Sequence, residues 1–253
     1  MQAIFSLRRN PQRLVLSLIW IFLAVPFAGA APAAAEPESQ QICPVASASR
    51  PPVRLSSPAA LAAASAPAPS GLDYSHLLET TPWGWPRLDH WCVWVEPLGE
   101  SSPGSRFEER WQQAVTGALA SWGSELSLVM VSHPDQAHIL VQRRRPPLLD
   151  AQGRRRASHG RALLEVLEVQ RQAVWRLEPR VLVLLSPDQR LEALQATALH
   201  EFGHAIGLWG HSDEPADAMA AVPGARPVLS LTARDRATVR WLYQQPSRFG
   251  KPP

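Results

Sequence analysis

The sequence is nearly without lysine, since Lys251 is the only one among 253 residues and almost all of the positive charge is arginine. The net charge is only +3, and a nucleic-acid-binding role would need basic residues gathered on one face with aromatics or a known motif. The dense basic runs, 143–145 and 154–156, flank a stretch with proline and glycine that indicates a loop. We therefore expect solvated loop charges and no nucleic-acid partner.

Cysteine is also scarce. Two cysteines, Cys43 and Cys92, cannot form a disulfide scaffold, so the fold must depend on its hydrophobic core. The two residues could pair in an exported protein, although Cys43 lies in a low-complexity region, which weakens the case. The sequence leaves this pairing open.

A long hydrophobic run is absent as well. The apolar stretch Leu14–Val25 is shorter than the roughly 20 residues that a membrane-spanning helix needs. Arginines precede it, and Pro26 and Ala28-Gly29-Ala30 follow, which is the pattern of a secretory signal peptide over residues 1–30. We expect a protein that is secreted or held in the cell envelope or periplasm, without stable membrane insertion after cleavage. An uncleaved membrane anchor is the alternative.

The remaining chain divides into two parts. Residues 31–82 are rich in Ala, Pro and Ser, a composition that buries too little apolar surface to fold, and they are predicted to be a disordered linker or pro-region. Residues 83–250 are predicted to form one α+β domain, in which a mixed five-stranded sheet packs on three helices. Apolar periodicity places the strands at 91–95, 126–131, 137–142, 161–170 and 180–186, and helices from Arg106 to Gly123, from Pro187 through residue 204, and after Thr232 with Asp235 as its capping partner.

A metal-site motif lies on the second of these helices. His200 and His204 are four residues apart, so on a helix both imidazoles project from one face and can reach one zinc ion. Glu201 lies beside the first ligand, where it can accept a proton from a water on the metal. The alternative is an ordinary helix with two surface histidines.

Three later features favour the metal site. Gly207 follows the second histidine by three residues, where a glycine can end the helix in a left-handed turn, and His211 lies where the returning chain could present a third nitrogen. Met219 follows after "SDEPADA". This segment resembles the metzincin zinc peptidases, and it is most similar to their matrixin branch because Ser212 follows the third histidine and Asp217 closely precedes the methionine.

The spacing departs from the metzincin pattern by one residue. The third histidine is expected three residues after the glycine, but Gly210 occupies that position and offers no ligand. Gly210 can adopt a positive φ and absorb the extra residue, which favours His211 as the third ligand. Asp213 is the alternative ligand.

The resemblance to exported bacterial matrixins spans residues 83–250 and implies a metzincin-like fold with one catalytic zinc ion, held by His200, His204 and His211. It implies an endopeptidase that cleaves proteins or peptides, with zinc activating a water and Glu201 as general base, and we expect the protein to be a monomer. Met219 would pack beneath the metal without binding it, Asp217 would orient that turn, and substrate would pair along a sheet edge at 161–169.

Other roles remain open. The domain could bind zinc without catalysis, or residues 31–82 could hold a protease latent until they are removed. His159 lacks the companions of a structural zinc site, so no second zinc is expected. Cys43 could bind the catalytic metal as an inhibitory thiolate, but its flanking residues give no support, and no matrixin-type cysteine switch is evident.

Overall fold

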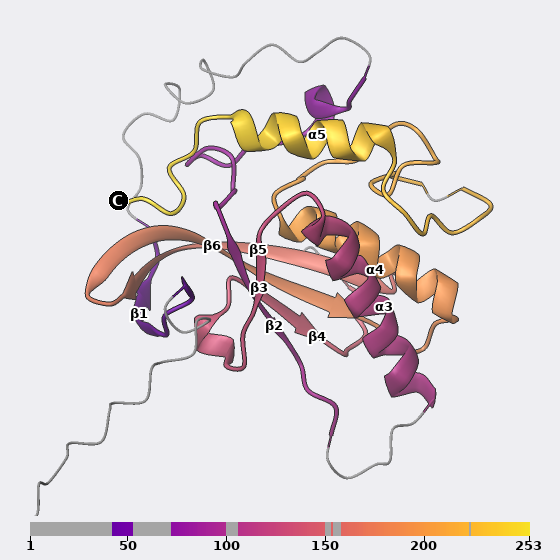
Figure 1. Ribbon diagram of the computed structural model, residues 1–253, viewed down its shortest axis with the longest axis horizontal. Helices are drawn as coiled ribbons and strands as arrows, with labels where there is room; N and C mark the ends of the chain where they lie inside the picture. Colours follow the sequence, from indigo (N-terminus) through magenta and orange to yellow (C-terminus); the bar gives the residue numbers. More distant parts are fainter. Residues whose placement is uncertain (1–41, 53–71, 100–105, 150–152, 154–157, 223) are drawn as a thin grey trace, which may run out of the picture. The chain divides into compact units, whose positions relative to one another are not determined.

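The computed structural model describes residues 42–52, 72–99, 106–149, 153, 158–222 and 224–253, and the expected signal peptide lies outside these ranges. The described chain forms an α+β domain with a mixed sheet and three α-helices (Figure 1). The strands are β1 (Ala46–Arg50), β2 (Trp91–Val95), β3 (Leu128–Met130), β4 (Ile139–Gln142), β5 (Gly160–Arg171) and β6 (Val174–Leu185). The helices are α3 (Arg106–Gly123), α4 (Leu191–Ala205) and α5 (Ala233–Gln244), with short 3-10 helices η1 (Ser75–Leu77) and η2 (Pro134–Gln136).

The sheet has six strands, in the order β1-β5-β6-β4-β2-β3, rather than the five that the sequence predicts. The additional strand is β1, which comes from the Ala-, Pro- and Ser-rich segment. The sequence does not predict this strand because its residues, Ala46–Arg50, have almost no apolar periodicity. Four of the five are exposed. Strands β2, β3, β4 and β6 are parallel, whereas β5 runs antiparallel to both β6 and β1.

Strand β5 is paired along its whole length on one side only. Its twelve residues all pair with β6, whereas β1 pairs only with Glu168–Arg171 at its far end. Within the described residues, the outer side of Gly160–Leu167 has no strand partner. The edge expected at 161–169 is therefore open over most of that range.

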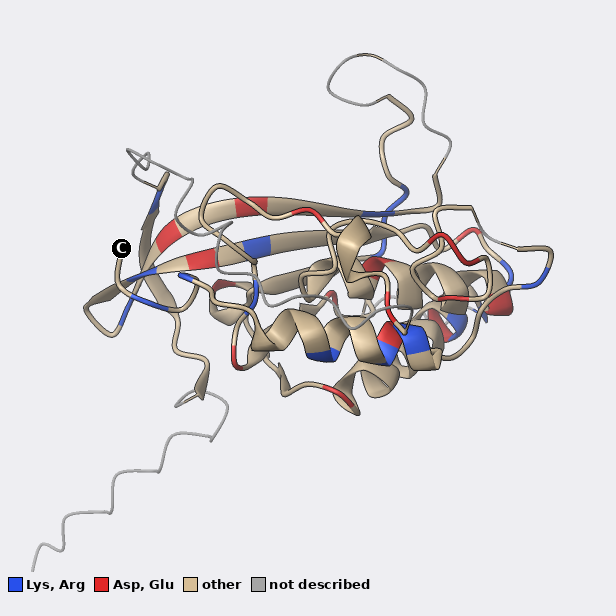
Figure 2. Ribbon diagram, turned by 90° about the horizontal axis from the view of Figure 1, so that it is seen from above, with Lys and Arg blue, Asp and Glu red and all other residues tan. Residues whose placement is uncertain are grey.

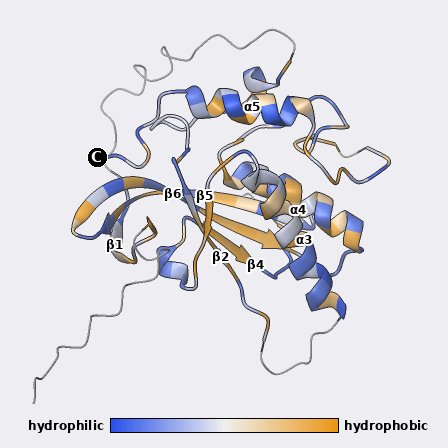
Figure 3. Cartoon of the chain, in the orientation of Figure 1, coloured by the Kyte–Doolittle hydropathy of each residue, from blue (hydrophilic) through white to orange (hydrophobic). Residues whose placement is uncertain are grey.

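Helices α3 and α4 lie side by side against one face of the sheet, and α5 packs near the C-terminal end of α4, where Tyr243 donates to the carbonyl oxygen of Ile206 at 2.9 Å (Figure 1). The core between the helices and the sheet is apolar, and Figure 3 shows the hydrophobic strands facing these helices. Trp111 and Trp122 of α3 are fully buried, and their indole N–H groups donate to the carbonyl oxygens of Leu185 and Leu199 at 3.2 and 2.9 Å. These tryptophans thus fix α3 to both β6 and α4.

The described parts of residues 31–82 pack on this domain. Tyr74 is fully buried in the main core, and Cys43 forms a disulfide with Cys92 in the central strand β2. The structure thus contains the pairing of Cys43 with Cys92 that the sequence leaves open. The fold therefore includes packed residues on the N-terminal side of residue 83.

Charges of both signs are distributed along the β5–β6 hairpin (Figure 2). Of the two basic runs, 154–156 lies outside the described residues, and Arg143 in the other pairs with Glu108 at 2.9 Å. In the described ranges, no helix combines the length and apolarity that crossing a membrane requires.

Candidate metal centre

Helix α4 carries the first two predicted ligands and ends just beyond them. Its inward side is held by buried apolar residues, among them Leu194, Ala198 and Phe202. The helix ends at Ala205, and Gly207 follows with a φ of +112°. A Cβ at Gly207 would lie 2.8 Å from the carbonyl oxygen of Pro86, so only glycine fits this turn.

The chain that returns from this turn brings His211 to His200 and His204. One ligand atom of each ring lies within 4.8 Å of those of the other two. The Nδ1 of His200 lies 2.9 Å from the carbonyl oxygen of Ala218, and that of His204 lies 2.7 Å from the carbonyl oxygen of Leu208. Because a carbonyl only accepts, each Nδ1 carries the proton, which leaves the Nε2 lone pairs free for a metal.

The low pKa values of the three rings also favour metal binding. Burial lowers the pKa of His204 to about 3, with a further contribution from His200. Burial also lowers the pKa of His200 and, through partial burial, that of His211. The rings are therefore neutral at physiological pH, which is the form that binds zinc.

The conformation of Gly210 and the position of Asp213 explain how the third histidine can follow Gly207 by four residues. Gly210 has a φ of +143°, which lets the chain bulge by one residue before His211. Asp213 is exposed and pairs with Arg234 at 2.7 Å, so its carboxylate points to α5 rather than joining the three imidazoles. The residues that come together are therefore the three histidines.

Glu201 is buried beside the start of β5. Burial raises the pKa of its carboxyl to about 7, while a hydrogen bond from the backbone of Ala162 and the charge of Arg161 act in the opposite direction. The strand comes so close that a Cβ on Gly160 would lie 2.7 Å from Cγ of Glu201 and 2.4 Å from Cγ2 of Thr197. A carboxyl with a pKa near neutrality is suited to exchanging protons at pH 7.

Met219 lies beneath this group of side chains. It is fully buried, and a Cβ on Gly203 of α4 would lie 2.1 Å from its sulfur, so the methionine packs directly on the helix backbone. Asp217 accepts hydrogen bonds from the hydroxyls of Ser212 at 2.5 Å and Thr232 at 2.6 Å. The turn is thereby fixed to the segment on either side of it.

Asp235 holds the same turn from α5, a role that the sequence does not reveal. Its carboxylate accepts a hydrogen bond from the backbone N–H of Ala218 at 2.9 Å. The carbonyl of Ala218 in turn holds the ring of His200. The sequence predicts only a helix-capping role for Asp235, because the contact between α5 and the turn depends on tertiary structure.

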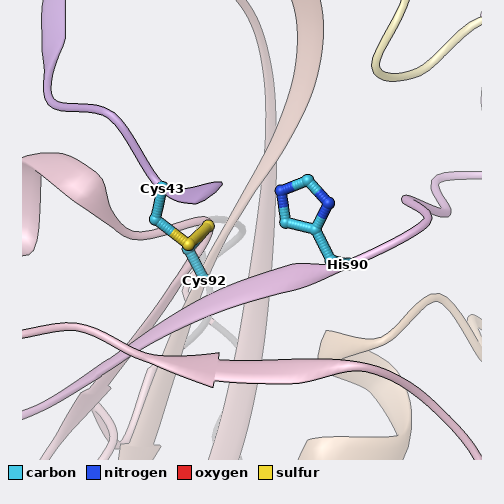
Figure 4. A group of neighbouring side chains, drawn as sticks. All are labelled: Cys43, His90 and Cys92. Carbon is cyan, nitrogen blue, oxygen red and sulfur yellow. A yellow bond between two sulfur atoms is a disulfide. The ribbon is translucent and has the colours of Figure 1, made fainter. Parts of the chain in front are cut away.

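Cys43, His90 and Cys92 form a second group of potential ligands (Figure 4). The two sulfurs are joined in the disulfide, so neither is available as a thiolate. This bond also removes Cys43 as an inhibitory ligand of the three histidines. The group therefore links β2 to the segment before β1.

A cavity of about 570 Å³ opens beside His200 and Glu201. Its walls come from α4, the start of β5 and the segment after Met219, and they are mostly apolar. Many of the lining side chains are small, including Ala193, Ala196, Ala218, Ala221 and Val228. A bulky apolar side chain can therefore enter next to the histidines.

Comparison with known families agrees with this arrangement. The matrixin family model matches residues 106–244, which is more than half of the chain and includes all of α3, α4 and α5. The chain belongs to the matrixin family. Matrixins are zinc metallopeptidases, and a peptidase family implies protein substrates. A search among curated proteins gives no match.

The family assignment and the α+β fold confirm two of the sequence predictions. Three features of this matrixin were not predicted: the close approach of Gly160, the hydrogen bond of Asp235 to the turn, and the contact of Leu77–Glu79 with Trp209 and Gly210. Each depends on residues far apart in the sequence. Only Gly160 gave a local signal, as a glycine at the start of a strand.

Proposed function

We propose that this matrixin is a zinc-dependent endopeptidase with Glu201 as its catalytic general base. The observation that carries the proposal is the convergence of three neutral imidazoles beside a buried carboxyl whose pKa is about 7, with the Nε2 atoms of His200 and His204 free. His200, His204 and His211 would hold the zinc ion. A zinc site with three protein ligands keeps a position for water, lowers the pKa of that water and polarises the scissile carbonyl.

The residues around the metal have separate tasks. Glu201 accepts a proton from the attacking water and returns it to the leaving amine. The backbone of Ala162 and the close approach of Gly160 hold that carboxyl in place. Ala218 and Leu208 orient two of the imidazoles through their carbonyl oxygens.

Substrate would bind as an extended chain along β5. The outer side of Gly160–Leu167 offers backbone groups to such a chain, and this edge starts beside Glu201. The apolar cavity next to His200 would accept one substrate side chain. We therefore expect cleavage beside large apolar residues in unfolded proteins, with a preference over small or charged ones.

We also propose that the protein is exported. The basic and apolar pattern of residues 1–30 supports a signal peptide. The disulfide between Cys43 and Cys92 is of the kind that persists in oxidising compartments outside the cytosol.

The test compares zinc content and casein cleavage for the wild type and Glu201→Ala. We expect about one zinc ion per chain in both proteins, and a loss of cleavage by about 100- to 10,000-fold in the variant, the usual contribution of general base catalysis. Unchanged cleavage by Glu201→Ala would refute the mechanism. Zinc binding without cleavage of any peptide in a diverse library would instead favour a catalytically idle zinc-binding domain.

The choice of third ligand is tested separately. His211→Ala is expected to weaken zinc binding, whereas Asp213→Ala is expected to leave it unchanged because that carboxylate pairs with Arg234. The measurement is the zinc dissociation constant in competition with a chelator. The reverse order of the two variants would assign the third ligand to Asp213.

A further inference from the structure

The segment Asp73–Glu79, which we call the brace, runs directly against the chain that carries His211. Leu78 and Gly210 form an antiparallel bridge, and the backbone N–H of Glu79 donates to the carbonyl oxygen of Trp209 at 2.5 Å. The brace thus pairs with the two residues that immediately precede the third histidine. This contact lies where the matrixin spacing gains its additional residue.

The contact is between two backbones, without room for a side chain. A Cβ on Gly210 would lie 2.3 Å from the carbonyl oxygen of Leu77 and 2.9 Å from Cα of Leu78. Neither atom can move away as a flexible side chain could. A glycine is therefore required at position 210 for two reasons: its φ of +143° is positive, and the brace approaches too closely for a side chain.

The brace is anchored at its other end on α5. Tyr74 is fully buried, its backbone N–H donates to the hydroxyl of Thr238 at 3.1 Å, and its own hydroxyl donates to Asp235 at 2.7 Å. Asp235 also receives the N–H of Ala218. One buried carboxylate therefore connects the brace to the turn that orients His200.

We propose that the brace is a positioning segment of the zinc site, whose backbone holds Trp209 and Gly210 so that the bulged chain delivers His211 to the metal. The proposal rests on the proposed zinc centre and deepens it. Cleavage on the C-terminal side of Tyr74 would separate the anchor on α5 from the residues of the brace that pair with Trp209 and Gly210.

The test removes the contact from each side. Glu79→Pro deletes the N–H that donates to Trp209. A proline restricts the preceding residue to an extended conformation, and Leu78 already has one (φ −83°, ψ 145°). The matched controls are Glu79→Ala, which removes the carboxylate that acts on His211 but keeps the N–H, and Thr80→Pro, the same substitution at the next, exposed position. Gly210→Ala blocks the contact from the other side, and its control is Gly117→Ala, where an added Cβ meets nothing within 4 Å.

Three quantities are measured on the full-length variants: the zinc dissociation constant, the number of imidazole ligands from X-ray absorption at the zinc edge, and the thermal unfolding of the metal-free protein. We expect Glu79→Pro and Gly210→Ala to weaken zinc binding by about 10- to 100-fold, as loss of ligand-orienting groups does elsewhere, and to show two imidazoles in place of three. The controls are expected to match the wild type in both metal measurements.

Wild-type affinity and three imidazoles in folded Glu79→Pro would overturn the proposal. If Gly210→Ala fails to fold, the proposal is judged from Glu79→Pro and from the milder Tyr74→Phe. The second of these variants keeps the aromatic ring and removes only the hydroxyl that anchors the brace on Asp235. A wild-type protein that binds no zinc through three imidazoles would refute the proposed function itself. The two failures are therefore distinguishable.

Discussion

At the scale of single residues, Gly160 makes a specific prediction about catalysis. An added methyl group would overlap both Glu201 and Thr197, so Gly160→Ala is expected to displace the carboxyl of Glu201 while leaving the three histidines in place. Displacement of a catalytic group by about 1 Å can lower a rate by about 100-fold. We expect a loss of that order in kcat for casein cleavage.

The control for this variant is Gly117→Ala, on an exposed position of α3. Both variants should retain about one zinc ion per chain. A Gly160→Ala protein with wild-type kcat would show that β5 does not position the general base.

The low pKa values of the histidines predict how zinc binding depends on pH. Protons compete with zinc for imidazole, so affinity falls once the pH drops below the pKa of the ligands. Burial lowers the pKa of all three rings, to about 3 for His204, and the decline should therefore begin at a lower pH than the ordinary histidine value of about 6.5 would give.

The corresponding measurement is the zinc dissociation constant of the metal-free protein between about pH 7.5 and pH 5, spanning the ordinary histidine pKa. We expect little change down to about pH 6, less than for an exposed three-histidine peptide as control. A decline that sets in as early as that of the peptide would contradict the pKa shifts.

At this scale the sequence predicts a group of side chains, and the structure brings the three histidines of that group together. His200, Glu201 and His204 could be assigned because their relation is set within one helical turn. The role of His211 required a choice against Asp213, and the structure separates the two because His211 joins the other histidines whereas Asp213 pairs with Arg234. Gly160 and Asp235 could not be assigned, because their contacts join segments that the sequence alone does not bring together.

At the scale of secondary structure, the start of α5 contributes to the turn as well as to its own helix. Thr232 forms a capping box with Asp235, as the sequence predicts, and its hydroxyl also donates to Asp217 at 2.6 Å. Thr232→Ala is expected to lower the free energy of unfolding by about 1 to 2 kcal/mol, the upper part of the range for a lost N-cap.

Chemical denaturation of the metal-free protein measures this loss. Thr232→Ser keeps the hydroxyl and should retain most of the stability. Equal destabilisation by the two substitutions would mean that the methyl group of Thr232, and not its hydrogen bonds, is responsible.

The elements themselves were predicted unequally. Helix α3 and the central strands follow from their apolar periodicity, because each has a buried face. The β5–β6 hairpin is longer than predicted because its turn consists of Gln172 and Ala173, which both adopt positive φ without the glycine or asparagine that usually indicates such a turn. Strand β1 was missed because it is held by pairing with β5 rather than by burial of its own side chains.

At the scale of the whole molecule, the disulfide between Cys43 and Cys92 is expected to contribute much of the stability. It closes a loop over a sequence separation of 49 residues, and removing a native disulfide from a small domain typically costs about 2 to 5 kcal/mol. The paired substitution of both cysteines by serine should lower the free energy of unfolding by an amount in that range.

The matching control is the wild type measured with and without a thiol reductant. The reductant should destabilise the wild type and leave the serine variant unaffected. If the wild type shows the same unfolding free energy in both conditions, the disulfide does not contribute to equilibrium stability.

Contacts between N-terminal and C-terminal segments also determine when the fold can be completed during synthesis. Tyr74 bonds to Asp235, a separation of 161 residues, and β1 pairs with β5, whose partner residues follow it by more than one hundred positions. Contacts over such distances close slowly, and neither can form until the later partner has left the ribosome. The hydrogen bonds of Asp235 to Tyr74 and to the turn that orients His200 therefore form only after α5 has been made, so the proposed zinc site gains these contacts late in synthesis.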